Sequence, residues 1–288
     1  MNTLRHKFTA ALAFVAASGL TLSSCQKEFN AKSYAPPKPP PSYFGYTNSK
    51  DIHPDKLVAY WPFSGNLKDS LSSTTGTATG TSFAAGVKGQ GLQGANNGYV
   101  ISDVPAAIKS LHSFTVSTWV NMPQNTTGAV GLLSIADDPN FWGTLDIFFD
   151  NGGTATTGVL KVHVYNRATG IKGADGWAGG YSVSKPWGTW IQIAVTYDDT
   201  AGVITVYYNG NVAGTVTPTG FAPLDWSGAT KMVFGTLQFQ TNPSLTGGAT
   251  SQGWASYVTG VEDQARFYSI PLSKNEVNAL YNLELAGR

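Results

Sequence analysis

The sequence predicts an all-β fold in which two antiparallel sheets pack face to face as a sandwich, with one short helix at the C-terminus. From residue 57 onward, short runs rich in valine, isoleucine, threonine and aromatic residues follow one another, separated by turn residues. A clear helical pattern with capping residues appears at the end of the chain. Consecutive strands without intervening helices favour a sandwich over a parallel βαβ sheet.

The first 25 residues have the three parts of a secretory signal. A positive start at residues 5–7 precedes an uncharged apolar run at residues 8–22, which is too short to span a bilayer comfortably. Leu22-Ser23-Ser24-Cys25 then resembles the bacterial lipobox, and Cys25 is the one cysteine in the chain. We therefore expect residues 1–25 to be a lipoprotein signal peptide that ends at a lipidated Cys25.

Residues 26–55 are expected to form a disordered, proline-rich tether, and residues 56–288 the folded domain. The proline run at residues 36–41 favours an extended polyproline II conformation. Gln26 is not the aspartate that retains lipoproteins at the inner membrane, and Lys27-Glu28 resembles a surface-export signal of Bacteroidetes lipoproteins. We expect an outer-membrane lipoprotein exposed at the cell surface, with the periplasmic face as the alternative.

The charge of the chain excludes some classes of partner. The net charge is +1 and 12% of the residues are charged, so no basic stripe is available to neutralise a phosphate backbone. Nucleic acid is therefore not an expected partner. The expected partner is a glycan or a cell-surface protein, and the membrane is reached through the lipid alone.

The expected strands follow in order along the domain. They cover residues 57–63, 114–121, 130–135, 145–149, 160–165, 190–197, 203–208, 212–216, 232–237 and 257–268. Asn209-Gly210 separates two of them, and we expect a type I′ hairpin there because both residues tolerate positive φ. Gly152-Gly153 indicates a second hairpin. Residues 166–186 and 238–257 are expected to be long loops.

The C-terminal helix is predicted from its capping residues. Ser273 is followed three residues later by Glu276, which is the capping-box signature. Val277, Leu280 and Tyr281 then fall on one helical face, which we expect to pack against the sandwich.

The domain resembles the LamG-like, concanavalin A-like lectin/glucanase group of jelly rolls. The segments that carry the resemblance are LVAYWPFSGNLKDS at 57–70, SFTVSTWVN at 113–121, WIQIAVTYDDTAGVITVYYNG at 190–210 and GVEDQARFYSIPLSKNEVNALY at 260–281. Gln192 and Gln264 depart from the pattern, in place of a histidine and an aspartate. The resemblance implies a two-sheet antiparallel jelly roll. Domains of this group often carry a structural calcium ion, and the resemblance implies that Asp263 and carbonyl groups of the opening segment would bind it; a surface aspartate without a metal is the alternative.

The same fold includes glycoside hydrolases, which depend on a pair of catalytic carboxyl groups. A retaining glycosidase places two of them about 5 Å apart. Asp146 and Asp150 share a face of one expected strand, but no glutamate accompanies them, and Thr144 stands where a nucleophile is expected. We therefore expect no catalytic residues, with a hydrolase that uses Asp146 or Asp150 as the less favoured alternative.

Several tryptophans lie outside the expected strands. Sugars stack their C–H faces on exposed aromatic rings, so Trp142, Trp177 and Trp254 are candidate ligand contacts. Trp177 is the strongest candidate, because the glycine-rich run at residues 173–181 is expected to hold it on a mobile loop. Tyr181 ends this run and belongs to the same candidate set.

A second set of candidates follows from strand alternation. Side chains alternate between the two faces of a strand, so Lys161, His163 and Tyr165 point together. Asp146 and Phe148 share that face if the two strands pair. The residues on this strand face and the aromatic candidates together predict a non-catalytic carbohydrate-binding protein that helps capture extracellular glycans. A protein-binding adhesion module is the alternative.

Overall fold

The computed structural model describes residues 39–138, 140–167, 174–221 and 223–288. The predicted signal peptide, the predicted lipidation site Cys25 and most of the predicted tether lie outside these residues. Residues 41–288 form one compact unit, and they contain all the secondary structure described below.

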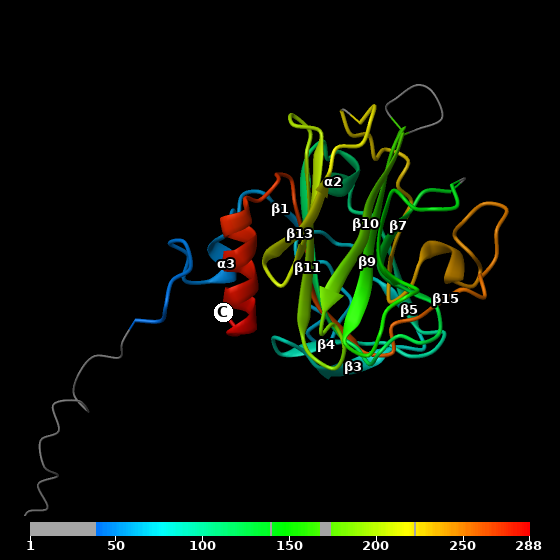
Figure 1. Cartoon of the computed structure of the whole chain (residues 1–288), viewed down its shortest axis with the longest axis horizontal. Coiled ribbons are helices and arrows are strands. Elements are labelled where there is room, and N and C mark those ends of the chain that lie inside the picture. Colours follow the sequence, from blue (N-terminus) through cyan, green and yellow to red (C-terminus); the bar gives the residue numbers. More distant parts are fainter. Residues whose placement is uncertain (1–38, 139, 168–173, 222) are drawn as a thin grey trace, which may run out of the picture. The chain divides into compact units, whose positions relative to one another are not determined.

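The unit is an all-β jelly roll of two eight-stranded sheets, as the sequence predicts (Figure 1). Sheet I has the order β13 (Asn211–Val216), β12 (Val203–Tyr208), β11 (Ile191–Asp198), β6 (Phe114–Asn121), β16 (Val261–Tyr268), β4 (Gln90–Gln93) and β3 (Ser82–Ala85), and β1 (Leu57–Trp61) also pairs with β16. Sheet II has the order β10 (Ala174–Ser184), β9 (Thr157–Asn166), β8 (Leu145–Asp150), β7 (Ala129–Ala136), β14 (Lys231–Phe234), β5 (Tyr99–Asp103) and β2 (Thr77–Thr79), and β15 (Ala255–Ser256) pairs with β7. The helices are η1 (Ser49–Asp51), α2 (Ala106–Lys109), η3 (Gln238–Gln240) and α3 (Lys274–Leu285).

The core between the sheets follows from strand alternation. In β9, Leu160, Val162 and Val164 join the main hydrophobic cluster, and the residues between them face outward. The expected hairpin at Asn209-Gly210 is confirmed, because both residues have positive φ between β12 and β13.

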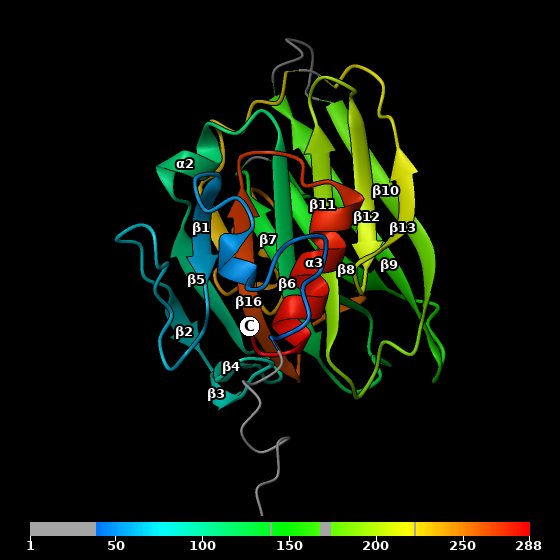
Figure 2. The ribbon, with the colours of Figure 1, turned by 90° about the vertical axis from the view of Figure 1, so that its left-hand side faces the viewer.

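Helix α3 packs against the central strands on the outer face of sheet I (Figure 2). Ser273 and Glu276 form the expected capping box. The buried carboxylate of Glu284 accepts hydrogen bonds from Trp119 Nε1 at 2.7 Å and Arg266 Nε at 2.6 Å. Trp119 is buried beneath this helix and stacks on Tyr281. Helix and sheet are thus joined by a buried ion pair.

The folded domain begins earlier than the sequence predicts, because residues 41–55 belong to the compact unit and not to the tether. Ile52 is buried in the cluster that α3 forms with sheet I. Ser49 Oγ donates to the backbone carbonyl of Arg288 at 2.6 Å, and His53 Nε2 lies 2.7 Å from Glu276 Oε1. These contacts with a C-terminal element were not visible in the local sequence pattern.

The prediction of a long loop at residues 166–186 is also wrong, because β10 occupies residues 174–184. Glycines at positions 176, 179 and 180 lower strand propensity but do not prevent pairing with β9. The expected strand at residues 257–268 is shorter: β15 lies just before it, and β16 starts at Val261.

A buried carboxyl group lies in β16. Glu262 is fully buried, and among the described residues no donor makes a well-formed hydrogen bond with its side chain. Burial raises the pKa of Glu262 well above its usual range, and the backbone of Gly235 opposes this shift only in part. The folded state therefore favours the protonated carboxyl. The resulting stabilisation is complete below pH 4.5 and is lost as the pH rises through the folded pKa.

Replacing Glu262 with glutamine should remove this pH dependence. The Glu262→Gln variant should unfold like the parent at pH 4. Above pH 4.5 the free energy of unfolding of the variant, measured relative to that of the parent, should rise by about 1.4 kcal/mol per pH unit until the Glu262 carboxyl of the folded parent ionises. Urea unfolding at a series of pH values measures this, with the exposed Asp55→Asn as control. Parallel curves for Glu262→Gln and the parent would contradict the assignment.

Candidate functional site

The outer face of sheet II carries a row of side chains from adjacent strands. Asp146 in β8 stands opposite His163 in β9, and His163 stands opposite Trp177 in β10. Phe148 and Lys161 form the next cross-strand pair. The sequence-based expectation that these side chains share one face if β8 and β9 pair is therefore met.

Asp146 is a fully buried carboxylate with several hydrogen-bond donors. It accepts hydrogen bonds from Ser134 Oγ in β7 and from the backbone N–H of Gly143 at 2.7 Å. His163 Nδ1 lies 3.2 Å from Asp146 Oδ2. The backbone N–H of Gln238 donates to Ser134 Oγ at 3.3 Å. One carboxylate thus links two neighbouring strands, the loop after β7 and, through Ser134, η3.

His163 is held between two carboxylates. Its Nε2 lies 2.7 Å from Asp175 Oδ1 on β10, on the other side of the ring from Asp146. Burial alone lowers the pKa of His163. The hydrogen bonds and charges of Asp146 and Asp175 raise this pKa by a larger amount, so it lies above its usual value. The hydrogen bond with His163 in turn lowers the pKa of Asp175. The side chain of Asp175 is exposed and that of His163 is buried.

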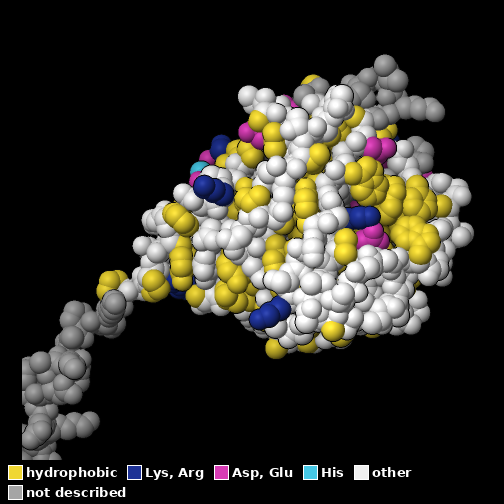
Figure 3. All heavy atoms as spheres, in the orientation of Figure 1, with side chains coloured by type: hydrophobic (Ala, Val, Ile, Leu, Met, Phe, Trp, Pro, Cys, Tyr) yellow, Lys and Arg dark blue, Asp and Glu magenta, His cyan; other side chains and the backbone are white. Residues whose placement is uncertain are grey.

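Aromatic rings cover this network. Trp142 lies at the centre, with ring centroids 5.0 Å from Trp177, 6.0 Å from Trp254 and 5.3 Å from Phe148. The Trp177 ring is 4.5 Å from the His163 ring. Figure 3 shows hydrophobic side chains gathered on this side of the molecule, with acidic and basic side chains beside them. We call Trp142, Trp177 and Trp254 the aromatic platform.

Exposure separates the platform from its support. Trp177 is 42% exposed and Trp254 39% exposed, whereas Phe148 and His163 are almost completely buried. The Trp142 ring is perpendicular to Trp177 and tilted by 42° from Trp254. The platform is therefore a stepped surface. Of the predicted contacts, the tryptophans face solvent, while Asp146, Phe148 and His163 support them from below.

Two loops carry Trp142 and Trp254, and η3 holds both. Gln238 Nε2 donates to the backbone carbonyls of Asn140 and Phe141 at 2.9 Å. The Phe239 ring stacks on Phe141 with centroids 4.5 Å apart and lies 5.2 Å from Trp254. The loops are fixed by side chains far away in the sequence.

A hollow of about 470 Å³ adjoins the platform. It is lined by Asn140, Phe141, Trp142, Tyr165 and Asp175. Tyr165 therefore joins the candidate surface, as expected. The lining offers an amide, a phenol and a carboxylate beside the aromatic rings, which is the mixture that orients polar ligands.

Tyr181 does not join the candidate surface. The register of β10 shifts between Gly179 and Tyr181, and Gly180 has a φ of +73°. This bulge moves Tyr181 opposite Leu160, a core-facing residue, so Tyr181 packs against the core. Without the bulge, Trp177 and Tyr181 would share one face of β10. Trp177 itself lies in a paired strand, not on the expected mobile loop.

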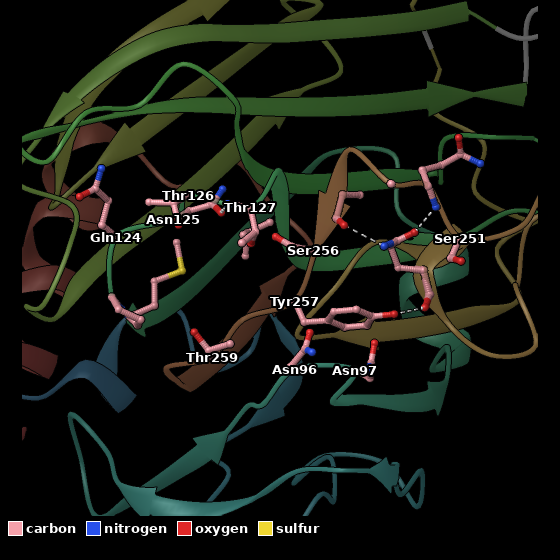
Figure 4. A pocket seen from close by; sticks show the side chains of 17 residues that line it. Asn96, Asn97, Gln124, Asn125, Thr126, Thr127, Ser251, Ser256, Tyr257 and Thr259 are labelled. Atoms are coloured by element: carbon pink, nitrogen blue, oxygen red, sulfur yellow. Dashed lines mark hydrogen bonds between the residues drawn. The ribbon is translucent and has the colours of Figure 1, made fainter.

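The sequence did not point to a second hollow, shown in Figure 4, at an end of the sandwich. This groove has a volume of about 550 Å³ and is lined by Gln240 and by residues from the segments 96–97, 122–130 and 251–259. An adjoining section of about 600 Å³ shares Asn97, Gln240, Ser251 and Tyr257 with it. We call the two sections the amide groove.

Asp263, the expected calcium ligand, is surrounded by N–H donors. Its carboxylate accepts hydrogen bonds from the backbone N–H groups of Lys88 at 3.0 Å and Gln264 at 2.8 Å. The opening-segment carbonyl of Pro62 faces the side-chain amide of Gln264 at 3.5 Å. Calcium needs converging oxygen ligands, so these residues as arranged do not fit a calcium site. Elsewhere in the described parts of the chain, no group of three His, Cys, Asp or Glu side chains is placed to hold a metal.

The two carboxylates considered for catalysis have other partners. Asp146 is buried within its hydrogen-bond network, and Asp150 forms an ion pair with Lys161 at 2.5 Å. In the part of the chain that the structure describes, no helix is long and apolar enough to cross a membrane.

Comparison with known proteins identifies the family to which the fold corresponds. The family model of the concanavalin A-like lectin/glucanases superfamily matches residues 93–278, which is more than half of the chain. No curated protein sequence matches the chain.

Several solved structures share the fold. The binding domain of Paraclostridial Mosquitocidal Protein 1 is 17% identical with a TM-score of 0.59, over 79% of this chain and 52% of that one. Domain 4 of AbnA, a GH43 extracellular arabinanase from Geobacillus stearothermophilus in complex with arabinotriose, is 22% identical with a TM-score of 0.50, over 78% and 98%. The binding domain of Botulinum Neurotoxin DC in complex with SialylT is 12% identical with a TM-score of 0.53, over 82% and 52%. The chain thus spans about half the length of the first and third. These likenesses establish the fold.

The pKa of His163 offers a test of the network beneath the platform. Because its folded pKa is raised, its stabilising contribution is complete below pH 6.5 and is lost as the pH rises through the folded pKa. The Asp175→Asn variant removes one carboxylate and should lower the pKa of His163. An NMR titration of the imidazole measures this, with the distant Asp103→Asn as control. An unchanged His163 titration in Asp175→Asn would show that the pair does not form.

Proposed function

The chain belongs to the concanavalin A-like lectin/glucanases superfamily, and from this premise we propose that it is a non-catalytic carbohydrate-binding lipoprotein of the cell surface. The aromatic platform is its ligand contact, and its role is to help capture extracellular glycans. Fold alone does not select a function, so the proposal rests on the site.

The observation that carries the proposal is the exposure of Trp177 and Trp254 on either side of half-buried Trp142. Large aromatic rings that remain in solvent on a well-packed sheet leave apolar area available to a ligand. Pyranose rings present C–H faces that pack on such rings, and their hydroxyl groups need polar partners nearby. Stepped rings suit a chain whose successive sugar units are rotated.

Polar groups stand where a stacked sugar would present its hydroxyls. Tyr165 and Asp175 line the hollow beside Trp142. The His163 ring holds Asp175 from behind, so that its carboxylate is oriented before a ligand arrives. The AbnA domain and the neurotoxin domain were solved with arabinotriose and SialylT respectively, which supports a sugar ligand.

The proposed role is binding without catalysis. Asp146 is buried and bonded to three partners, and Asp150 is paired with Lys161. A retaining glycosidase needs two carboxyl groups free to flank the scissile bond. A protein ligand is the second candidate, favoured by the apolar area of the same platform.

A glycan array with the purified protein tests this function, followed by titration of each bound glycan. The Trp177→Ala and Trp254→Ala variants should each weaken binding by about tenfold or more, because each removes an exposed stacking ring. Phe83→Ala, which removes an exposed ring on sheet I, should bind as the parent does. Binding to no glycan would overturn the proposal in favour of a protein ligand. Shortened polysaccharide chains after prolonged incubation would contradict the non-catalytic role.

The membrane anchor is proposed from the lipobox-like sequence that ends at Cys25. A lipid there and a proline-rich tether would hold the binding domain away from an outer membrane. Cells that express the protein should incorporate radiolabelled palmitate into it, and Cys25→Ala should abolish the label. Label retained by Cys25→Ala, or protein released without a lipid, would contradict the anchor. Protease treatment of intact cells distinguishes the surface from the periplasmic face.

A further inference from the structure

We infer that the amide groove is a second binding site, specific for a neutral oligosaccharide. The inference deepens the proposed function and rests on it, because it assigns the same class of ligand to a separate surface. The groove lies apart from the platform hollow and shares no lining residue with it.

The lining of the groove selects against charged ligands. Both sections are lined entirely by uncharged residues, most of which carry amide or hydroxyl groups. An anionic sugar, a phosphate group or a charged peptide would lose water there without gaining a partner of opposite charge. A neutral polyhydroxylated chain loses only neutral hydrogen bonds, which amides and hydroxyls replace.

Unpaired amides supply those hydrogen bonds. Asn96, Asn97 and Gln124 are exposed at the groove, and their side chains make no hydrogen bond with any other described residue. Figure 4 shows Asn96 and Asn97 beside the Tyr257 ring. Each amide offers a donor and an acceptor side by side, which matches a pair of neighbouring sugar hydroxyls.

The wall behind these amides is fixed. Tyr257 donates its hydroxyl hydrogen to the backbone carbonyl of Gln240 at 2.8 Å. The buried Gln240 side chain donates to the carbonyl of Ala255 at 3.0 Å and accepts from the backbone N–H of Gln252. The Tyr257 ring is therefore oriented before a ligand binds, which lowers the entropy cost of binding. It provides a face on which a sugar ring can pack.

The groove and the platform are joined through shared segments. Trp254 of the platform stands between Gly253 and Ala255, which both line the groove. In η3, Phe239 packs against the platform rings and Gln240 lines the groove. An oligosaccharide long enough to reach both surfaces gains from a high effective concentration at the second one. Affinity should therefore rise with chain length.

Calorimetric titration of the purified protein with neutral gluco-, manno- and xylo-oligosaccharides, as disaccharides and hexasaccharides, tests the inference. Ser251→Arg places a bulky charge where the two groove sections meet, and Ser82→Arg is the matched control on an exposed strand of sheet I. A second variant, Asn96→Ala with Gln124→Ala, removes two unpaired amides from exposed positions. Trp177→Ala reports on the platform separately.

We expect Ser251→Arg and the double variant to lower the affinity for a bound hexasaccharide by about tenfold, with Ser82→Arg unchanged. Disaccharides that depend on Trp177 should bind these groove variants as they bind the parent. Hexasaccharide affinities unaffected by the groove variants would overturn the inference while leaving the platform intact. If the protein binds only anionic glycans and Trp177→Ala loses that binding, the groove inference is overturned and the platform is supported. A loss of oligosaccharide affinity in the groove variants, with no loss in Trp177→Ala, would support binding in the groove and refute binding on the platform.

Discussion

The buried carboxylate of Asp146 is the point on which the candidate surface depends. It binds Ser134 in β7, the backbone of Gly143 next to Trp142, and His163, which in turn holds Asp175. A charge removed from water must be matched by such donors, and removing one partner of a buried ionic contact costs about 3–5 kcal/mol. Its geometry therefore fixes the strand, the loop and the ring orientations together.

The outer faces of the two sheets differ in how their side chains are buried. On sheet I, Glu284 of α3 pairs with Arg266, and the helix packs against the central strands. On sheet II the buried network reaches the surface at Asp175, and exposed tryptophans lie over it. The helix buries the centre of one face, whereas the other face leaves large aromatic rings in solvent.

Strand alternation in β8 and β9 correctly grouped Asp146 with His163, because their register depends only on a local hairpin. Tyr181 was misplaced because a single bulge at Gly180 reverses the face, and glycine-rich composition made a paired strand resemble a loop. The amide groove was missed because it is built from several segments that meet only in the folded state. Periodicity reports neighbours along a strand, and it does not report which loops converge.

The most direct measurement is a crystal structure of the protein with the neutral oligosaccharide that binds it most tightly. We expect one sugar ring packed on Trp177 or Trp254, with a hydroxyl in hydrogen-bond contact with Asp175 or Tyr165. Further units of a longer chain should lie in the amide groove beside Tyr257. A ligand bound outside both surfaces, with the tryptophans still in solvent, would contradict the account.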